Sequence, residues 1–232
     1  MLVYGRNVAK EVLQKPEKVK KVLLQKDFND KTINSLLEKN KIKIEYLDKK
    51  GFLPFDKYSH QGIILDIEDF SYTNFKDFLD IDDAKVVILD HLEDPHNLGA
   101  IIRTCEAAGI TGIIIPKDRS VDINSTVMKT SAGALENVKV AKVTNLVNVI
   151  GELKENGFWI VGTAMEGNFD YRDIDYTGKI ALVIGNEGNG ISKAVLNECD
   201  YLARIPMYGK INSLNASVAA GIMIYEVISL DR

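Results

Sequence analysis

The second half of the chain alternates short apolar runs with segments of helical spacing. Four runs are apolar throughout, without alternating polar positions, and these are Val86–Leu89, Ile113–Ile115, Phe158–Val161 and Ala181–Ile184. Strands that are buried on both faces have this composition, and they occur in parallel sheets whose connections are helices. The pattern therefore predicts an α/β domain with a parallel sheet, spanning about residues 85–232.

Two helices of this domain are indicated by their ends. The first would begin near Asn97, a residue type that favours the N-cap, and would close at Gly109. The last is expected to run from about Ala216 to Ser229. The inward face of the first helix would carry Ile101, Ile102, Cys105 and Ala108.

A smaller α/β unit is expected before this domain. Strand composition marks Val19–Leu24, Ile42–Leu47 and Ile63–Leu65. A helix between the first two strands would carry Ile33, Leu36 and Leu37, with Asp30 and Thr32 as caps. These elements predict a domain over residues 1–68. Residues 69–84 are aromatic and acidic without a clear period, so we expect a linker there.

Charge is divided unequally between the two regions. Residues 1–60 hold 14 Lys and Arg against 8 Asp and Glu, a net charge of +6, whereas residues 61–232 carry −10. A basic N-terminal unit suits contact with phosphate groups of a nucleic acid. Taken alone, however, the division of charge favours the simpler alternative of a solvated lysine-rich surface with no partner.

Composition also bears on the compartment. No apolar run approaches the length that spans a bilayer, and the first residues do not begin a secretory signal. Cys105 and Cys199 are too few for a disulfide framework, so we expect packing residues in a reducing environment. The sequence therefore predicts a cytoplasmic protein without membrane segments.

Three polar segments follow expected strands of the second domain, namely Asp94–Thr104, Ile184–Ser192 and Ile205–Ser217. The glycines of the second segment suit a sharp turn or close approach to a ligand. A phosphate-binding loop would need Lys after its last glycine, but Gly190 is followed by Ile191. In the third segment, Ser213 or Asn215 could cap the last helix.

A metal site is not expected. Asp90, His91, Glu93, Asp94 and His96 are ligand types, but their spacing matches no standard zinc pattern, and a turn at Pro95 explains their polarity.

In this order, the three segments closely resemble the signature motifs of the SpoU/TrmH family, in the SPOUT superfamily. Its members are S-adenosylmethionine-dependent RNA ribose 2′-O-methyltransferases. The resemblance implies that the C-terminal parallel-sheet domain contains a deep trefoil knot. Val3–Val8, Lys20–Leu24 and Ser59–Ile64 are similar to the L30e-like substrate-binding domain of the ribosomal branch. That branch modifies a guanosine of large-subunit (23S) rRNA, so RNA is the implied partner. Antibiotic-resistance methylators of the family share the two-domain layout but modify an rRNA adenosine, so the target base stays open.

The same resemblance implies a set of site residues. S-adenosylmethionine would be held by Gly185, Ile205 and Leu214, with Thr163, Glu187 and Met207 lining the pocket. The implied catalytic residues are Arg103, Asn97, Glu187 and Asn215.

The role of Arg103 is open between two alternatives. Family accounts make this position a general base, but guanidinium loses its proton only with great difficulty. Arg103 would otherwise bind the target phosphate and stabilise developing alkoxide charge. Without the motif, a surface arginine in a salt bridge is the simpler interpretation. Asn97 would either orient Arg103 or cap its helix.

The family also implies a homodimer that pairs across the C-terminal helices. Val218, Ala219, Ile222 and Met223 suit such packing, although they would suit the protein's own core equally well. Three functional alternatives stay open: a tRNA target, a non-catalytic RNA-binding protein of ribosome assembly, and a nucleotide-binding enzyme that uses the glycine-rich loop.

Overall fold

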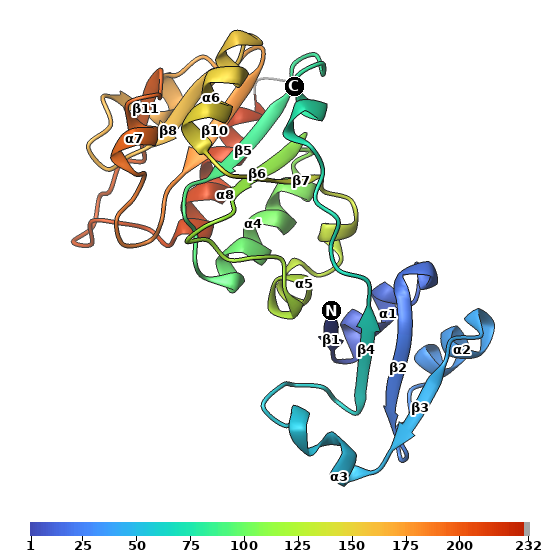
Figure 1. Ribbon diagram of the computed structural model, residues 1–232. Helices are drawn as coiled ribbons and strands as arrows, with labels where there is room; N and C mark the ends of the chain where they lie inside the picture. The colour runs from blue at the N-terminus through green and yellow to red at the C-terminus, as the bar shows by residue number, and fades with distance from the viewer. Residues whose placement is uncertain (230–232) are drawn as a thin grey trace. The chain divides into compact units, whose positions relative to one another are not determined.

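The computed structural model describes residues 1–229, and these form two compact units. Residues 1–71 with 123–133 make the first unit, and residues 72–122 with those from 134 onward make the second. The sequence pattern placed 123–133 in the second domain because no change in composition marks it. Instead its helix α5 (Ser125–Ser131) packs against β1 (Leu2–Tyr4) of the first unit. Figure 1 colours the chain by residue number.

The first unit is built on a four-stranded sheet of order β1-β4-β2-β3. Strand β4 pairs antiparallel with β1 and β2, and β2 pairs parallel with β3. The strands are β1 (Leu2–Tyr4), β2 (Val19–Gln25), β3 (Ile44–Leu47) and β4 (Ile63–Ile67). Besides α5, the unit contains helices α1 (Arg6–Val12), α2 (Lys31–Asn40) and α3 (Lys49–Phe52) and the 3-10 turns η1 (Pro16–Lys18) and η2 (Leu53–Phe55).

The helix cap and the strands predicted for the first unit are largely present in the structure. The Asp30 carboxylate caps α2 by accepting the backbone N–H groups of Thr32 and Ile33, at 3.1 and 3.2 Å. The strand expected from Ile42 begins at Ile44. Ile64 is fully buried because it packs with Leu23 and Phe52 on one face of the sheet.

Residues 72–84 are not a free linker. Phe78 of η3 (Phe75–Phe78) is fully buried, and a Cβ on Gly112 would come within 2.3 Å of its ring. Thr73 forms a parallel bridge with Ala141 of β7 (Val140–Val143), and the Tyr72 hydroxyl donates to Asp122 at 2.6 Å. The only regular element of this segment is one 3-10 turn, so its sequence shows no helical or strand period. The burial of Phe78 depends on tertiary packing and could not be predicted from such a period.

The second unit contains a seven-stranded sheet of order β7-β6-β5-β10-β8-β11-β9, in which every described pair of strands is parallel. Its 3-10 turns besides η3 are η4 (Ala134–Glu136) and η5 (Tyr171–Asp173). Its strands and helices are β5 (Lys85–Leu89), α4 (Pro95–Ala107), β6 (Gly112–Pro116), β7 (Val140–Val143), α6 (Leu146–Glu155), β8 (Trp159–Thr163), β9 (Phe169–Asp170), β10 (Ile180–Ile184), α7 (Lys193–Leu196), β11 (Tyr201–Arg204) and α8 (Ala216–Val227).

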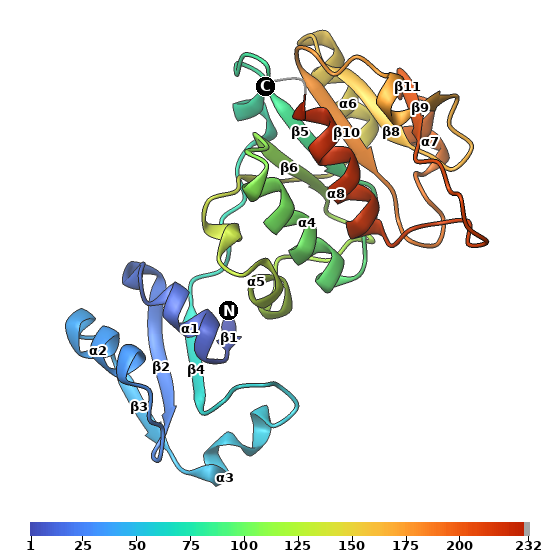
Figure 2. The same ribbon diagram turned by 180° about the vertical axis from the view of Figure 1, so that it is seen from behind.

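Helices cover both faces of this sheet. Helices α4 and α8 pack together on one face, and α6 and α7 lie on the other (Figures 1 and 2). Strands β5, β6 and β10 are buried at every position, which is why their sequences, apart from Lys85 at the start of β5, carry no charged residue. The predicted parallel α/β fold is confirmed. Within residues 1–229, no helix is both long enough and apolar enough to cross a bilayer.

The order of the strands brings the motif segments together. Strand β10 lies between β5 and β8 although it follows both in the chain, and the sheet extends in opposite directions from β5. Because the strands are parallel, their carboxyl ends share one edge, and ligand sites of open α/β sheets lie where the strand order reverses. The trefoil knot implied by the resemblance stays a prediction.

Candidate active site

Asn97 joins all three motif segments. It lies in the first turns of α4 and is 6% exposed. Its Nδ2 donates to Glu187 Oε1 at 2.5 Å, and its Oδ1 accepts from Asn215 Nδ2 at 3.0 Å. One buried amide therefore connects the helix after β5, the loop after β10 and the start of α8.

Asn97 has neither of the two roles expected of it. The N-cap of α4 is Asp94, whose Oδ1 accepts the backbone N–H of His96 at 2.8 Å, and Pro95 takes the first helical position. A proline there has no N–H to satisfy, so the helix begins before Asn97. The hydrogen bonds of Asn97 go to Glu187 and Asn215, so it does not orient Arg103. Gly109 closes the helix as expected, with φ +71°.

Asn215 is both a helix cap and a member of the site. Its Oδ1 accepts from the backbone N–H and the hydroxyl of Ser217, at 2.9 and 2.5 Å, at the start of α8. Because Oδ1 is occupied by donors, Nδ2 must face Asn97. The direction of each hydrogen bond in the chain is thereby set, and it ends on Glu187 as an acceptor, which suits an ionised carboxylate.

The glycine-rich loop folds back on itself. The backbone N–H of Asn186 donates to the Gly190 carbonyl at 3.0 Å, and the Gly190 N–H returns to the Asn186 carbonyl at 2.9 Å. The Asn186 side chain accepts from the Gly188 N–H at 2.8 Å and donates to the His91 carbonyl at 2.8 Å. These N–H groups are therefore committed within the loop, which disfavours a phosphate cradle.

Gly185 is required by the loop backbone. A Cβ there would lie 2.2 Å from the Gly190 carbonyl carbon and 2.3 Å from the Ile191 nitrogen. We expected Gly185→Val to weaken cofactor binding and leave the fold largely intact. That expectation is wrong, because any side chain at this position collides with the protein's own main chain.

Asp90 holds the base of the same loop, a role that the sequence did not indicate. Its side chain is buried; Oδ2 accepts the Ser192 N–H at 2.6 Å, and Oδ1 lies 2.5 Å from His91 Nδ1. The sequence signal that could have indicated this role is an acidic residue directly after an apolar strand, because such a residue lies at the carboxyl edge of the parallel sheet. Residues 1–229 contain no group of three His, Cys, Asp or Glu side chains that could hold a metal ion.

The expected cofactor residues come from neighbouring strand ends. Thr163 ends β8 and donates to the Val183 carbonyl at 3.1 Å, Gly185 follows β10, and Ile205 follows β11. Strands β10, β8 and β11 are adjacent. The structure thus brings these three positions to one edge.

Met207 and Leu214 lie in the non-helical segment between β11 and α8. Like Ile205, both are half-buried. Their backbone N–H groups donate to no backbone carbonyl within the part of the chain that the structure describes. Partly enclosed apolar side chains beside unpaired backbone donors fit a ligand with an adenine ring and a sulfonium chain.

Arg103 stands apart from the chain of hydrogen bonds. It is exposed on α4, six residues after Asn97, and so lies roughly 120° away around the helix. Its guanidinium makes no hydrogen bond or ion pair with any of residues 1–229, so the salt-bridge interpretation is wrong. Its donors are available to a ligand.

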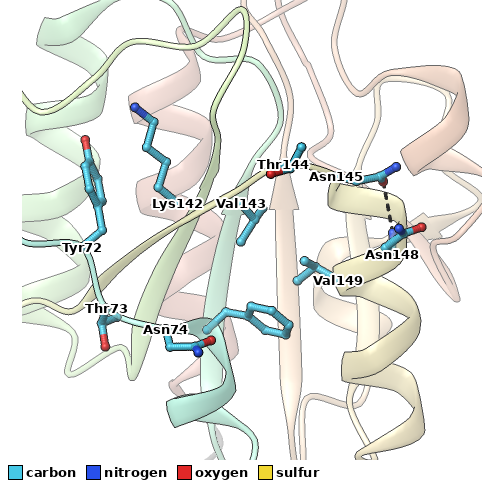
Figure 3. A pocket seen from close by; sticks show the side chains of 10 residues that line it. Tyr72, Thr73, Asn74, Lys142, Val143, Thr144, Asn145, Asn148 and Val149 are labelled. Atoms are coloured by element: carbon cyan, nitrogen blue, oxygen red, sulfur yellow. Dashed lines mark hydrogen bonds between the residues drawn. The ribbon is translucent and has the colours of Figure 1, made fainter.

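The second unit also has a surface hollow away from the candidate active site. It measures about 560 Å³, and Figure 3 shows Thr73 and Asn74 across it from Thr144 and Asn145. None of the expected site residues lines it. It arises where the segment before η3 runs beside the last residues of β7 and the first turn of α6.

Two family profiles match the chain. The SpoU rRNA methylase family matches residues 84–225, and an RNA 2′-O ribose methyltransferase substrate-binding domain matches residues 2–73. The chain belongs to the SpoU methylase family. A Staphylococcus saprophyticus protein assigned to the TrmH family of tRNA/rRNA methyltransferases is 43% identical over 235 residues, covering 98% of this chain and 94% of the relative.

Solved structures of SpoU methylases extend the match over both units. AviRb from Streptomyces viridochromogenes, a SpoU methyltransferase in complex with the cofactor AdoMet, is 26% identical with a TM-score of 0.84. It covers 100% of this chain and 90% of its own. An AdoMet-bound rRNA methyltransferase from Sinorhizobium meliloti is 26% identical with a TM-score of 0.81, covering 99% and 87%. The chain is an RNA methyltransferase of the SpoU/TrmH family.

Proposed function

We propose that this protein transfers a methyl group from S-adenosylmethionine to the ribose 2′-hydroxyl of a guanosine in large-subunit (23S) rRNA. The observation that carries the activity is the hydrogen-bonded chain Glu187–Asn97–Asn215, which joins the three motif segments beside the cofactor positions. When bound, S-adenosylmethionine supplies an electrophilic methyl group on its sulfonium. Gly185, Ile205 and Leu214 would hold it, with Thr163, Glu187 and Met207 beside them.

Side chains of the protein bind the RNA and position the groups that react. Arg103 offers an unpaired fork of N–H donors, which binds an RNA phosphate and stabilises negative charge developing on the attacking oxygen. We favour this electrostatic role over that of a general base, because a guanidinium keeps its proton. Asn97 is a positioning residue: it holds Glu187 relative to α8 and thereby fixes the loop beside the cofactor.

A two-unit relative supports the ribosomal target. The structure of the Sinorhizobium meliloti rRNA methyltransferase covers 99% of this chain. By contrast, a tRNA-modifying TrmH/SpoU enzyme from A. aeolicus covers only 63% of this chain, with a TM-score of 0.57. We therefore propose an rRNA target that is bound by both units of the protein.

A homodimer is proposed from an apolar surface on the second unit. On α8, Val218 and Tyr225 are 50% and 48% exposed, whereas Met223, which we expected on this face, is fully buried in the protein's own core. Trp159, Phe169 and Tyr201 lie at the edge formed by β8, β9 and β11, with ring centroids 5.6 to 5.8 Å apart along the row. A second copy of the chain would cover these side chains, as the pairing of family members across the last helix implies.

The test of function is methyl transfer from tritiated S-adenosylmethionine to separate rRNA and tRNA pools. We expect label in large-subunit rRNA, mapped to one guanosine ribose. Label confined to tRNA would favour the alternative target. Stable RNA binding without label in either pool would favour the non-catalytic assembly protein instead.

A further inference from the structure

A second hollow lies in the first unit, at the carboxyl end of β1. It has a volume of about 250 Å³, enough for one nucleobase, and it is formed entirely by residues of that unit. Tyr4 forms part of its wall, and its ring is fixed by a parallel stack on Tyr58, with centroids 4.3 Å apart. The polar lining includes Asn7, Glu11 and Gln61.

Glu11 is the unusual group in this hollow. Its side chain is half-buried, and a Cβ on Gly133 would lie 3.2 Å from its carboxyl carbon. Its carboxylate makes no hydrogen bond or ion pair with any other residue among those described. Burial raises the pKa of this carboxyl, since the charged form has lost water without gaining a donor.

Nearby cations do not neutralise Glu11. Arg6 and Lys10 turn instead to Asp30, with nitrogen-to-oxygen distances of 3.9 and 3.2 Å. Lys129, which also lines the hollow, forms no ion pair with Glu11. The carboxylate thus has two oxygen atoms left to accept hydrogen bonds from a ligand.

Gln61 supplies a donor of fixed direction. Its Oε1 accepts the backbone N–H of Arg6 at 2.9 Å, so its Nε2 must point away from that bond. Like Glu11, this amide nitrogen has no partner among residues 1–229. The hollow therefore presents an acceptor pair from Glu11 and a donor from Gln61 beside an aromatic wall.

We infer that this hollow binds an unpaired guanine of the RNA substrate, with Glu11 accepting from the base N1–H and N2–H groups and Gln61 donating to its O6. Guanine is the RNA base with two adjacent donors next to an acceptor on its Watson–Crick edge, whereas adenine, cytosine and uracil offer single donors there. Unpaired bases in RNA loops are read in this way, through their edges and by contact with aromatic side chains. The inference rests on the proposed function, because it describes how the RNA substrate is chosen.

The test measures binding of the full-length protein to fluorescently labelled hexaribonucleotides by anisotropy. The probes are oligouridines that differ at one central base: guanine, inosine, adenine or uracil. We expect guanine to bind about tenfold more tightly than adenine or uracil, as for one bidentate contact. Inosine, which lacks the N2 amino group, should lie between them.

Glu11→Gln should abolish this preference, because the amide replaces one of the two acceptor oxygens with an NH2 group, which would face a donor of the base. Glu17→Gln is the matched control: it removes one exposed acid from the same unit and should keep the preference. Gln61→Glu is a second, isosteric variant that retains an acceptor for Arg6 but repels O6, and it should also lose the preference. A wild-type protein without discrimination, or a folded Glu11→Gln variant that keeps it, would overturn the inference.

Methyl transfer separates this inference from the proposed function. A wild-type protein that methylates rRNA but shows no guanine preference would overturn the guanine site alone. Guanine preference without methylation of any RNA pool would support the site and count against the proposed activity.

Discussion

Asn97 and Glu187 lie 90 residues apart in the chain and are joined by a hydrogen bond of 2.5 Å from amide to carboxylate. The bond links the helix after β5 to the loop after β10, and a second hydrogen bond, from Asn215 Nδ2 to Asn97 Oδ1, adds the start of α8. The arrangement of the site therefore depends on the buried Asn97 side chain, whose amide nitrogen and amide oxygen are both hydrogen-bonded.

Asn97→Asp should impair methyl transfer by about tenfold or more. The substitution keeps the side chain's shape but replaces the donor to Glu187 with a second carboxylate oxygen, so the two groups repel each other. Losing a buried hydrogen bond costs about 1–3 kcal/mol, which denaturant unfolding would detect. Asn148→Asp on α6 is the control, since Asn148 is exposed, and it should leave both quantities nearly unchanged.

Arg103→Ala should lower methyl transfer by at least about a hundredfold and barely change the affinity for S-adenosylmethionine. The guanidinium makes no hydrogen bond or ion pair with residues 1–229, so its removal leaves no partner unpaired and the protein should stay folded. Arg103→Lys should rescue little, because lysine lacks the planar fork. Lys76→Ala controls for the loss of one surface charge. Calorimetry showing lost cofactor binding would instead place Arg103 in the cofactor site.

Gly185→Ala should reduce the melting temperature and the affinity for S-adenosylmethionine together. The added Cβ would lie 2.2 Å from Gly190, so the loop must shift. Gly151→Ala is the matched control on α6, where no atom lies within 4 Å of the new Cβ. It should be neutral or stabilise by about 0.5–1 kcal/mol. A Gly185→Ala protein with unchanged melting temperature would contradict this explanation.

Tyr225→Glu should convert the proposed homodimer to a monomer, because it places a charge on the exposed apolar face of α8. Light scattering at micromolar concentration measures the change in mass. Lys39→Glu on α2 reverses a charge on another exposed surface and should leave the dimer intact. A wild-type monomer under the same conditions would remove the basis for the proposal.

Both thiols should react slowly with Ellman's reagent in the native protein and rapidly in denaturant. Cys105 is fully buried, and burial raises the pKa of Cys199 to about 12, with Asp200 adding to the effect. The thiol pKa values in the folded state lie above the unfolded value. Their contribution to stability is therefore present below about pH 8.5 and is lost as the pH rises towards 12.

The sequence by itself determined the elements whose signals are local. Continuous apolar runs marked the buried parallel strands, Asp30 and Gly109 marked helix ends, and the order of the motifs marked the family. These features could be predicted because a cap or a buried strand is specified by residues close together in the chain.

Only the tertiary structure decided how those segments use their side chains. Asn97 looked like a cap until Pro95 began the helix earlier and placed the amide between Glu187 and Asn215. Phe78 and residues 123–133 have no period that reveals their burial or the unit to which they belong. In each case the deciding contact joins residues far apart in the chain, and local composition cannot specify such a contact.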